Sequence, residues 1–497
     1  MSEPKMRSEV TLRNLIKNLS TKKVAGDLSL KIRGISYNSQ KVKKNDLFVA
    51  ISGFRQDGHK FIRQALRKGA CAVVAEQNGD YQAPAKILVP NSRLSLAQLS
   101  NRFFNYPSQK LKVIGVTGTN GKTTTTYLIK SILEEAGEKT GLIGTITYLI
   151  DGKKIPATNT TPESLDLQQM FYEMQKEKVK NVVMEVSSHS LALNRVAGID
   201  FGIAVFTNLN REHLDFHKTM KNYRDTKGML FESLKGKDKF AIINQDDKNW
   251  KFFYKKSKVK NLTYSLEDKK ADFHPLYYNL GWDGSFIEFK TPNGICELNL
   301  QLLGRFNLYN SLASWAVGYA SGLKPETIKE GLEKVKNVSG RIQTVKKGQA
   351  FNVIIDYAHT PEAFRMILQA ARELTSGKIV IVFGCGGDRD KGKRPQMGKI
   401  ASDKADFVIL TTDNPRSEDP QRISRDIIAG MKKKNYEVVM DRKKAIAKAV
   451  AYLKEDDTLI LAGKGHEDYQ IIKDKKYHFS DKETVEEILA KKGYKNA

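Results

Sequence analysis

One stretch of the sequence, residues 113–126, constrains the fold more than any other. It reads Val-Ile-Gly-Val-Thr-Gly-Thr-Asn-Gly-Lys-Thr-Thr-Thr-Thr, and the apolar residues of the following segment, 127–133, have helical spacing. A strand, a glycine-rich turn and a helix N-terminus in this order turn backbone N–H groups toward a phosphate. The strict P-loop spacing would require glycine where Val116 stands, so this loop is a variant of that pattern.

The residue types in this loop predict a nucleotide phosphate site. Gly118 and Gly121 let the backbone approach a ligand closely. Lys122 can reach the outer phosphates, and the Thr123 hydroxyl can ligate Mg²⁺. An ordinary glycine-rich turn is the alternative, but a Lys-Thr pair that opens a helix after three glycines disfavours it.

Length and charge bound the other possibilities. A chain of 497 residues, of which 40% are hydrophobic, has material for about three domains. The formal net charge of +27 could serve nucleic-acid binding or the attraction of anionic small molecules. The alternative is that lysines cover solvated faces, and we favour it because they form short clusters along the whole chain, as at 41–44 and 432–434. We therefore expect no nucleic-acid partner.

The cysteines and the N-terminus predict a cytoplasmic protein. Cys71, Cys296 and Cys385 are scattered without metal-type spacing, as reduced thiols of a cytosolic protein would be. Residues 1–23 are polar and lack the apolar core of a signal peptide. No apolar run approaches the roughly 20 residues of a membrane span.

The pattern of apolar runs predicts an α/β protein of three domains, at 1–105, 106–338 and 339–497, with a polar linker at 106–110. Continuous apolar runs that alternate with helical segments indicate buried parallel strands, and hence a doubly wound sheet around the phosphate loop. The last domain repeats this pattern and is expected to be Rossmann-like. Residues 260–303 read as a β extension of the central domain. The other expected strands are 46–51, 72–75, 181–186, 201–206, 240–243, 352–355, 379–383, 407–410, 437–439 and 458–461, with a helix at 59–68.

Polar residues follow several of these strands, where open α/β sheets bind ligands. Glu185 ends an apolar run and is expected to ligate Mg²⁺ beside Thr123. His213 follows the next strand and is a candidate second ligand or phosphate donor, whereas Asp215 and His217 are expected to be structural. The loop 386–394 holds four cations and two aspartates; we favour anion binding over a solvated charge run because the loop directly follows a strand.

Seven motifs together resemble those of the Mur ligases: Gly118-Thr-Asn-Gly-Lys-Thr123, Met184-Glu-Val-Ser-Ser-His189, Glu212-His-Leu-Asp215, Gly304-Arg-Phe-Asn307, Asp356-Tyr-Ala-His-Thr-Pro361, the loop 384–395 and Asp413-Asn-Pro-Arg416. The resemblance covers nearly the whole chain. The phosphate loop alone indicates only the superfamily, which includes folylpolyglutamate synthetase. The combination with Asp-Asn-Pro-Arg and Gly-Lys-Gly-His-Glu is more specific and resembles the branch that adds meso-diaminopimelate.

The resemblance implies a role for each matching position. The uracil end of a UDP-sugar peptide would be held by Tyr37, Ser39, Phe54, Arg55 and Gln56, and its muramoyl-dipeptide by Asn159, Thr160, Thr161, Ser187 and Arg195. ATP would be held by Gly118, Thr119, Asn120, Gly121, Lys122, Thr123 and Thr124, with Asn307, Arg341 and Asp356 nearby. Lys227 matches a lysine that is carbamylated in the family, so the implied metal ligands are Thr123, Glu185, His213 and the Lys227 carbamate, and the implied catalytic residues are Lys122, Glu185, His213 and Lys227. The incoming amino acid would be held by Arg389, Asp413, Asn414, Pro415, Arg416, Gly463 and Glu467.

Three positions depart from the family pattern. Asn38-Ser39-Gln40 stands where Asp-Ser-Arg is common, Gln343 replaces a glutamate, and Leu193 replaces a glutamine near the peptide site. The first and third affect the expected substrate contacts but not the expected reaction.

The implied reaction is an ATP-dependent ligation in peptidoglycan precursor synthesis, with ATP and Mg²⁺ as cofactors and a monomeric enzyme. ATP would phosphorylate the D-Glu γ-carboxylate of UDP-MurNAc-L-Ala-D-Glu, and the amine of meso-diaminopimelate would then attack the acyl phosphate. Arg416 is expected to bind the distal carboxylate of that amino acid, the alternative being a surface pair with Glu418 or Asp419. The remaining alternatives are the same reaction with lysine or glutamate, a nucleic-acid-dependent P-loop ATPase, and a non-catalytic UDP-sugar binding protein.

Overall fold

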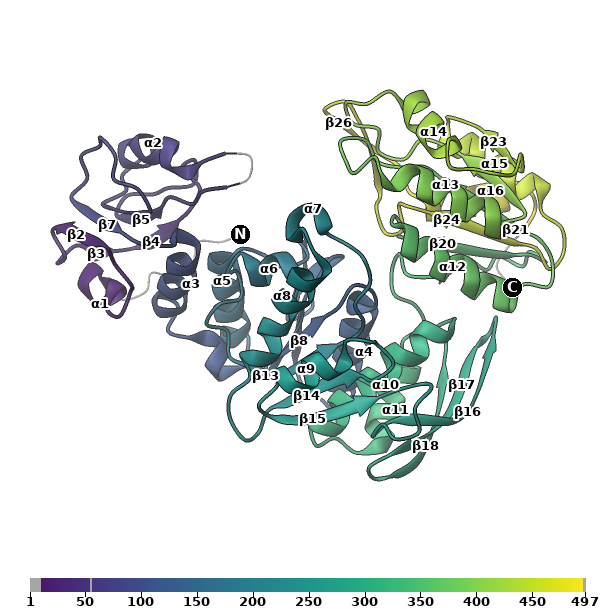
Figure 1. Ribbon diagram of the computed structural model, residues 1–497, viewed down its shortest axis with the longest axis horizontal. Helices are drawn as coiled ribbons and strands as arrows, with labels where there is room; N and C mark the ends of the chain where they lie inside the picture. Colours follow the sequence, from purple (N-terminus) through teal and green to yellow (C-terminus); the bar gives the residue numbers. More distant parts are fainter. Residues whose placement is uncertain (1–9, 54–55, 495–497) are drawn as a thin grey trace.

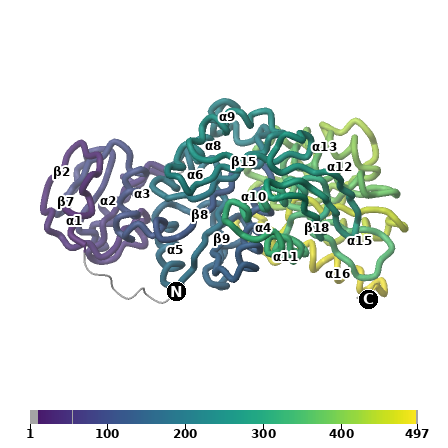
Figure 2. Tube along the Cα trace, turned by 90° about the horizontal axis from the view of Figure 1, so that it is seen from below, coloured from purple at the N-terminus to yellow at the C-terminus, as the bar shows by residue number. Residues whose placement is uncertain are grey.

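The computed structural model describes residues 10–53 and 56–494, so Phe54 and Arg55 of the expected uracil site lie outside the described residues. Three sheet-containing parts follow one another along the long axis of the molecule, in chain order (Figures 1 and 2). No helix in the described ranges is long and apolar enough to cross a membrane.

The N-terminal part is built on a five-stranded sheet in the order β2-β7-β6-β5-β4. Its strands β4 to β7 are parallel, and β2 is antiparallel to β7. The strands expected at 46–51 and 72–75 are confirmed, because these buried runs form β5 and β6. The elements are β1 Val10–Thr11, α1 Leu12–Ile16, β2 Lys23–Gly26, β3 Lys31–Ile32, β4 Gly34–Ser36, β5 Asp46–Val49, η1 Gly58–Phe61, α2 Ile62–Arg67, β6 Ala72–Ala75, β7 Ala85–Leu88 and α3 Ser92–Phe103.

The expected linker at 106–110 has a regular structure. It forms the 3₁₀ helix η2 Pro107–Lys110, in which Pro107 and Ser108 are buried. The Ser108 hydroxyl accepts a hydrogen bond from the backbone of Asp200, and η2 lies against α5. The connection to the central part is therefore packed onto that part.

The central part is a doubly wound eight-stranded sheet in the order β11-β10-β9-β12-β8-β13-β14-β15. The six strands from β9 to β15 in this order are parallel, and the hairpin strands β10 and β11 are antiparallel. Its elements are β8 Lys112–Thr117, α4 Lys122–Glu135, β9 Thr140–Ile143, β10 Thr147–Ile150, β11 Lys153–Pro156, α5 Ser164–Lys176, β12 Asn181–Glu185, α6 Ser188–Ala192, β13 Phe201–Phe206, α7 Leu214–His217, α8 Met220–Glu232, β14 Phe240–Asn244, α9 Trp250–Lys256, β15 Lys260–Tyr264, α10 Arg305–Ala320 and α11 Pro325–Glu333.

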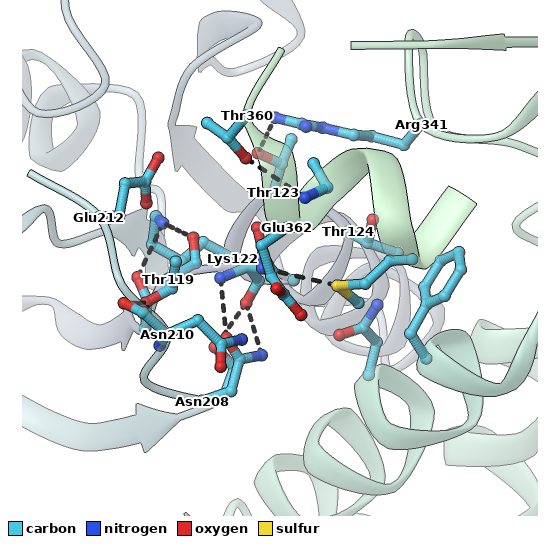
Figure 3. A pocket seen from close by; sticks show the side chains of 18 of the residues that line it. Thr119, Lys122, Thr123, Thr124, Asn208, Asn210, Glu212, Arg341, Thr360 and Glu362 are labelled. Atoms are coloured by element: carbon cyan, nitrogen blue, oxygen red, sulfur yellow. Dashed lines mark hydrogen bonds between the residues drawn. The ribbon is translucent and has the colours of Figure 1, made fainter. Parts of the chain in front are cut away.

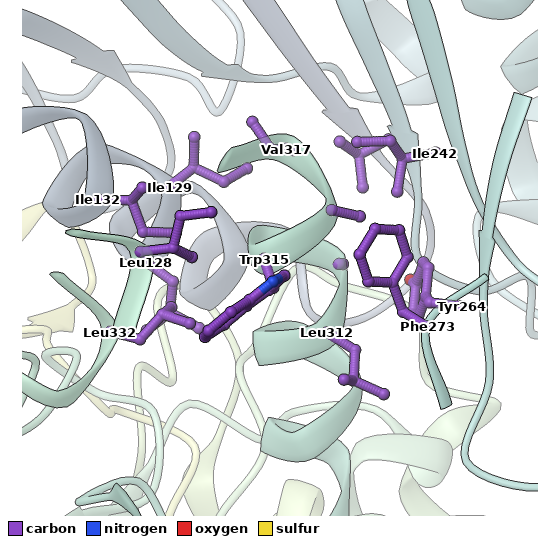
Figure 4. Close-up of a cluster of buried hydrophobic side chains, with 14 of the residues drawn as sticks. Leu128, Ile129, Ile132, Ile242, Tyr264, Phe273, Leu312, Trp315, Val317 and Leu332 are labelled. Atoms are coloured by element: carbon purple, nitrogen blue, oxygen red, sulfur yellow. The ribbon is translucent and has the colours of Figure 1, made fainter. Parts of the chain in front are cut away.

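A core lies on each face of this sheet. On one face, α4, α10 and α11 pack side chains such as Ile132, Trp315 and Leu332 against one another and against the strands (Figure 4). On the other face, Phe171 of α5 and Phe231 of α8 lie against β12 and β13. Burial of a large apolar side chain contributes about 1.5–3 kcal/mol, so the two cores hold the phosphate loop between rigid elements.

The expected β extension is partly confirmed. A separate antiparallel sheet contains β16 His274–Gly281, β17 Gly284–Thr291 and β18 Gly294–Leu300, whereas β15, also within 260–303, joins the main sheet as a parallel edge strand. At the tip of the β16–β17 hairpin, Trp282 donates a hydrogen bond of 2.6 Å from Nε1 to the carbonyl of Leu374. The Asp283 carboxylate next to it pairs with Lys346 at 3.0 Å. The hairpin therefore reaches the C-terminal part.

The C-terminal part is a six-stranded sheet in the order β19-β20-β24-β21-β22-β23, parallel except for β19. All five strands expected here are confirmed, as β20 to β24. Its elements are β19 Gln343–Thr344, β20 Asn352–Asp356, α12 Pro361–Leu374, β21 Ile379–Phe383, α13 Lys393–Lys404, β22 Phe407–Leu410, α14 Pro420–Ile428, β23 Tyr436–Val438, α15 Arg442–Tyr452, β24 Thr458–Ala462, β25 Tyr469–Ile472, β26 Lys475–His478 and α16 Asp481–Lys491.

Candidate active site

The phosphate loop lies between β8 and α4, as its sequence predicts. Gly118 and Gly121 have φ angles of 152° and 85°, in the range that favours glycine. A Cβ added to Gly118 would lie 1.9 Å from the Thr207 hydroxyl, and one added to Gly121 would lie 2.5 Å from the Asn310 side chain. Both glycines are therefore needed for this path of the chain. The loop opens into a cavity of about 590 Å³ lined by the central and C-terminal parts.

Two lysines meet at this loop. The Lys122 ammonium donates to the carbonyls of Gly118 (2.8 Å) and Thr119 (2.7 Å). The Lys227 ammonium, from α8, donates to the same Gly118 carbonyl at 2.9 Å. Burial lowers the pKa of Lys122, although Glu212 and Glu185 oppose the effect. Lys227 is only 1% exposed, and burial, followed by the charge of Lys122, lowers its pKa well below the ordinary value.

The expected pair Thr123 and Glu185 is in direct contact. The Thr123 hydroxyl lies 3.0 Å from Glu185 Oε1. Thr145 donates to the same carboxylate from its backbone N–H (2.8 Å) and its hydroxyl (3.0 Å). Arg341, which follows the C-terminal boundary of the central part, reaches Thr123 Oγ1 at 3.2 Å (Figure 3). Thr145 had no signal in the sequence, because only the fold brings it to Glu185.

This donor set fits a magnesium ion shared with phosphate oxygens. The described residues contain no cluster of three or more His, Cys, Asp or Glu side chains that could hold a metal. Mg²⁺, however, is a hard cation that binds through one or two carboxylates together with substrate phosphates. Glu185 is a carboxylate of this kind, and His213 and Lys227 line the same cavity. An unmodified lysine is a poor partner for a cation, so Lys227 fits the metal site only as a carbamate.

Part of the cavity lining is apolar and aromatic, which suits a nucleoside. Phe306 and Tyr309 line the cavity from α10, and Met366 and Ala370 line it from α12. The predicted Asn307 does not line the cavity: its side chain donates to the Leu303 carbonyl and accepts a bond of 2.9 Å from Asn310, which does. Asn310 stands one helical turn after the Gly-Arg-Phe-Asn motif, so its spacing could have indicated it.

Asp356 lines the cavity from the end of β20. Its carboxylate accepts backbone hydrogen bonds from Ile342 (2.8 Å) and Ala358 (2.7 Å). Burial raises its pKa, and the nearby Arg341 guanidinium opposes the effect. Asp356 therefore fixes the backbone on both sides of β20, beside Arg341.

The residues expected to hold the muramoyl-dipeptide lie together beside Glu185. Thr160 and Ser187 line the cavity. The Thr161 hydroxyl donates to the Glu185 carbonyl at 2.9 Å, and Arg195 Nη1 donates to the Thr161 carbonyl at 3.1 Å. The Asn159 carbonyl accepts a 2.6 Å bond from the hydroxyl of Tyr148.

The remaining residues of the expected uracil site lie in the N-terminal part, outside this cavity. Tyr37 donates to Asp166 at 2.7 Å, Ser39 donates to Gln64 at 2.8 Å, and Gln56 is exposed.

The residues expected to hold the amino acid form a second cluster, on the C-terminal sheet. Asn414 donates to Glu467 at 2.8 Å, and Arg416 Nη1 donates to the Gly387 carbonyl at 2.9 Å. Lys464, which was not among the predicted site residues, is fully buried with its ammonium 3.4 Å from both Asn414 and Glu467. Burial raises the pKa of the Glu467 carboxyl, and Lys464 opposes this.

The other residues expected to hold the amino acid lie around this cluster. Asp413 is buried and reaches Gly463, where an added Cβ would lie 2.7 Å from the Asp413 carboxylate. Pro415 is buried too, and its carbonyl lies against Gly387. Arg389 is exposed, and its guanidinium donates to the neighbouring Asp388 carbonyl.

The structure changes two expectations about the loops 386–394 and 413–416. The alternative pairing of Arg416 with Glu418 is wrong, because Glu418 binds Arg394 through both of its oxygens at 3.0 Å. The four cations of the loop 386–394 also do not act alike: Arg394 is fully buried and additionally bonds Asp426 at 2.8 Å. Arg394 therefore holds α13 to α14 and is not available to bind an anion.

Comparison with known proteins agrees with this architecture. Family models match over residues 31–104 (Mur ligase family, catalytic domain), 116–318 (Mur ligase middle domain) and 340–465 (Mur ligase, glutamate ligase domain). The chain is 45% identical over 488 residues to a UDP-N-acetylmuramoyl-L-alanyl-D-glutamate–2,6-diaminopimelate ligase of Clostridium tetani, covering 96% of this chain and 99% of the relative. The enzyme of the same name from Clostridium botulinum is 46% identical, covering 92% and 95%.

Solved structures show the same fold. A diaminopimelate ligase of the same name has a TM-score of 0.70 at 30% identity, covering 98% of this chain and all of the other. A folylpolyglutamate synthase of Mycobacterium tuberculosis, solved with ADP, has a TM-score of 0.63 at 18% identity, covering 74% and 92%, which supports the fold alone. With three matched domains and relatives of 45% identity along nearly its whole length, the chain belongs to the Mur ligase family of ATP-dependent amino-acid ligases.

Proposed function

We propose that the protein joins meso-diaminopimelate to the D-Glu γ-carboxylate of UDP-MurNAc-L-Ala-D-Glu, with ATP hydrolysed to ADP and phosphate. The observation that carries the proposal is the meeting of Lys122, the Thr123–Glu185 pair and the buried Lys227 in one cavity, beside the dipeptide-binding candidates Thr160 and Ser187. A carboxylate and a terminal phosphate that enter this cavity from opposite ends would meet at these charges.

The first step would transfer the terminal phosphoryl group to the γ-carboxylate. The backbone N–H groups at the start of α4 would hold the phosphates. The Lys122 ammonium would leave the Gly118 and Thr119 carbonyls and follow the charge that develops on the transferring group. Arg341 already lies on Thr123 and would bring a second positive charge from the C-terminal side. Mg²⁺ held by Thr123, Glu185, His213 and the Lys227 carbamate would offset the phosphate charge.

The lowered pKa of Lys227 supports the carbamate. Only a neutral amine reacts with CO₂, and burial beside Lys122 favours the neutral amine. The carbamate formed would be an anion next to the Lys122 cation, and that positive charge would stabilise it.

In the second step the amine of the incoming amino acid would attack the acyl phosphate through a tetrahedral intermediate and expel phosphate. Arg416 and Arg389 would bind the distal and proximal carboxylates, and Asp413, Asn414 and Glu467 would bind the distal ammonium and position the loop. The amino-acid cluster lies outside the cavity, so the reaction requires the C-terminal part to move toward the phosphate loop and exclude water from the acyl phosphate.

Ligation of L-lysine is the second candidate function. Arg416 argues against it. Its Nη1 donates to the Gly387 and Asn414 carbonyls, and within the part of the chain that the structure describes the other guanidinium edge has no hydrogen bond, so it would suit a carboxylate that lysine lacks. We further propose that the enzyme is cytoplasmic, since its nucleotide substrates are cytoplasmic, and that it is a monomer. Light scattering would test the monomer.

The test is an assay of ADP and ligated product with UDP-MurNAc-L-Ala-D-Glu and either meso-diaminopimelate or L-lysine. Product with diaminopimelate, dependent on all three substrates and on Mg²⁺, is the expected result. Preference for lysine, or ATP hydrolysis without an amide product, would contradict the proposal.

A further inference from the structure

The first turn of α5 joins the N-terminal part to the active-site cavity. α5 begins three residues after Thr161, and it lies side by side with α3 of the N-terminal part (Figure 1). Leu165 in this turn packs against the core of the N-terminal sheet. Asp166, the next residue, accepts the 2.7 Å hydrogen bond from Tyr37. This turn therefore contacts both the expected uracil site and the expected dipeptide loop.

Glu163 is the residue of this turn that binds in both directions. Its Oε1 accepts from the backbone N–H of Ser164 at 3.0 Å and caps the helix. Its Oε2 lies 3.1 Å from Nη1 of Arg93, at the start of α3, and 3.4 Å from Nε of Arg195. The side chains of Arg93, Glu163 and Arg195 are only 16%, 11% and 20% exposed, respectively. One carboxylate thus lies between two guanidinium groups in a partly desolvated site, where such contacts are stronger than at the surface.

The contacts of Arg195 leave N–H donors for a ligand. Nη1 donates to the Thr161 carbonyl, and Nε lies 3.4 Å from Glu163 Oε2 without forming a hydrogen bond. Among the described residues, no hydrogen bond engages Nη2. Thr161 is itself fixed to the end of β12 through the Glu185 carbonyl. Arg195 is therefore fixed by one hydrogen bond and one charge contact, and within the described residues its Nε and Nη2 donors have no hydrogen-bond partner.

We propose that Glu163 is a positioning residue for the sugar-dipeptide substrate. Its carboxylate aligns Arg195 for a substrate carboxylate, and through Arg93 it ties that alignment to the part that holds the uridine end. The inference rests on the proposed function, in which Arg195 contacts the muramoyl-dipeptide. Without the negative charge, Arg93 and Arg195 would repel each other and Arg195 would lose its orientation. The alternative is that Glu163 competes with the substrate for Arg195, and in that case removal of the charge would lower the KM for the substrate.

The test is Glu163→Gln in the full-length enzyme. The amide oxygen preserves the helix cap, so the change removes mainly the charge. We expect the KM for UDP-MurNAc-L-Ala-D-Glu to rise roughly tenfold, as for one weakened charge-assisted hydrogen bond. The KM for ATP and kcat should stay within about twofold. Calorimetry without ATP should show the same tenfold loss in the affinity for the UDP substrate.

Two further variants separate positioning from general stability. Arg93→Ala should raise the same KM by a smaller factor. In the double variant Arg93→Ala/Glu163→Gln, the rise in KM should be smaller than the product of the two single effects, because both changes disrupt one contact. Glu173→Gln changes the same residue type at the far end of α5, where among the described residues the Glu173 carboxylate bonds only Gln169, and should leave all constants unchanged.

Three outcomes would overturn the inference. An unchanged KM in a folded Glu163→Gln enzyme would show that the charge does not align Arg195, and a lower KM would show competition. A joint fall of kcat, ATP affinity and melting temperature would show a structural role alone. Wild-type enzyme that binds and turns over no UDP-muramoyl-dipeptide would instead remove the proposed function, and the inference with it.

Discussion

Replacing Arg416 by alanine tests how the enzyme chooses its amino acid. Arg416 has a φ of 52°, and its Nη1 donates to the Gly387 and Asn414 carbonyls at 2.9 and 3.4 Å. These two bonds fix the plane of the guanidinium. Among the described residues no hydrogen bond engages its other edge, which the proposed function assigns to the distal carboxylate of diaminopimelate. Alanine has the same Cβ as arginine, so the backbone at this φ keeps the same steric strain and the change isolates the guanidinium.

The magnitude follows from the bonds that are lost. A carboxylate bound by a fixed guanidinium edge accepts two parallel charge-assisted bonds, and loss of such a pair costs about 2–5 kcal/mol in binding or catalysis. At about 1.4 kcal/mol per factor of ten, kcat/KM for diaminopimelate should fall about 30- to 4,000-fold. Lysine lacks the distal carboxylate, so its slow use should fall much less. Arg416→Lys keeps the charge without the fork and should give an intermediate loss.

The assay is steady-state ligation with each amino acid at saturating ATP and UDP substrate. Arg425→Ala is a matched control, because Arg425 is 74% exposed on the same C-terminal part and pairs only weakly with Asp419. Equal losses for both amino acids, or a wild-type enzyme that prefers lysine, would refute the assignment of Arg416.

Three further predictions concern the remaining charges. Lys122→Ala should abolish ligation while circular dichroism stays unchanged, and near-normal turnover would contradict its role at the phosphates. Lys227→Ala should have low activity that a short carboxylic acid partly restores, and full activity without that acid would exclude the carbamate. Arg394→Met should lower the free energy of unfolding by about 3–5 kcal/mol at pH 7, because it strands the carboxylates of Glu418 and Asp426. The Arg394 hydrogen bonds lower the pKa of Glu418 to about 2 from 4.5. The stabilisation is therefore present above pH 4.5 and is lost as the pH falls toward 2. In urea unfolding, the difference in unfolding free energy between wild type and variant should be smaller at pH 3 than at pH 7, and an equal difference at both pH values would contradict the prediction.

The strands and the phosphate loop could be predicted because their signals are local. Buried parallel strands are continuous apolar runs, and 379–383 became the fully buried β21. Glu185 stood out as a charge inside such a run, and it meets Thr123 as expected. The functional roles of these residues remain predictions that the proposed assays test.

Other features depend on contacts between distant residues and had no local signal. The partners of Arg394 stand 24 and 32 positions away, so its burial could not be read from the charged loop around it. Lys227 has the pattern of a surface helix lysine, and only the packing of α8 against the phosphate loop buries it. β15 was grouped with the three strands that follow it because a short apolar run does not reveal which sheet it joins.

The hairpin that reaches from the central part to α12 provides a natural optical reporter. The chain has three tryptophans. Trp315 is 2% exposed inside the central core, and Trp250 lies on α9. Trp282 donates its indole N–H to a carbonyl of the C-terminal part and packs against that part's core. The fluorescence of Trp282 depends on this polar contact, so any turn of the C-terminal part that breaks it will shift the emission without an added dye. A chain in which phenylalanine replaces the other two tryptophans would let stopped-flow mixing with nucleotide time that movement directly.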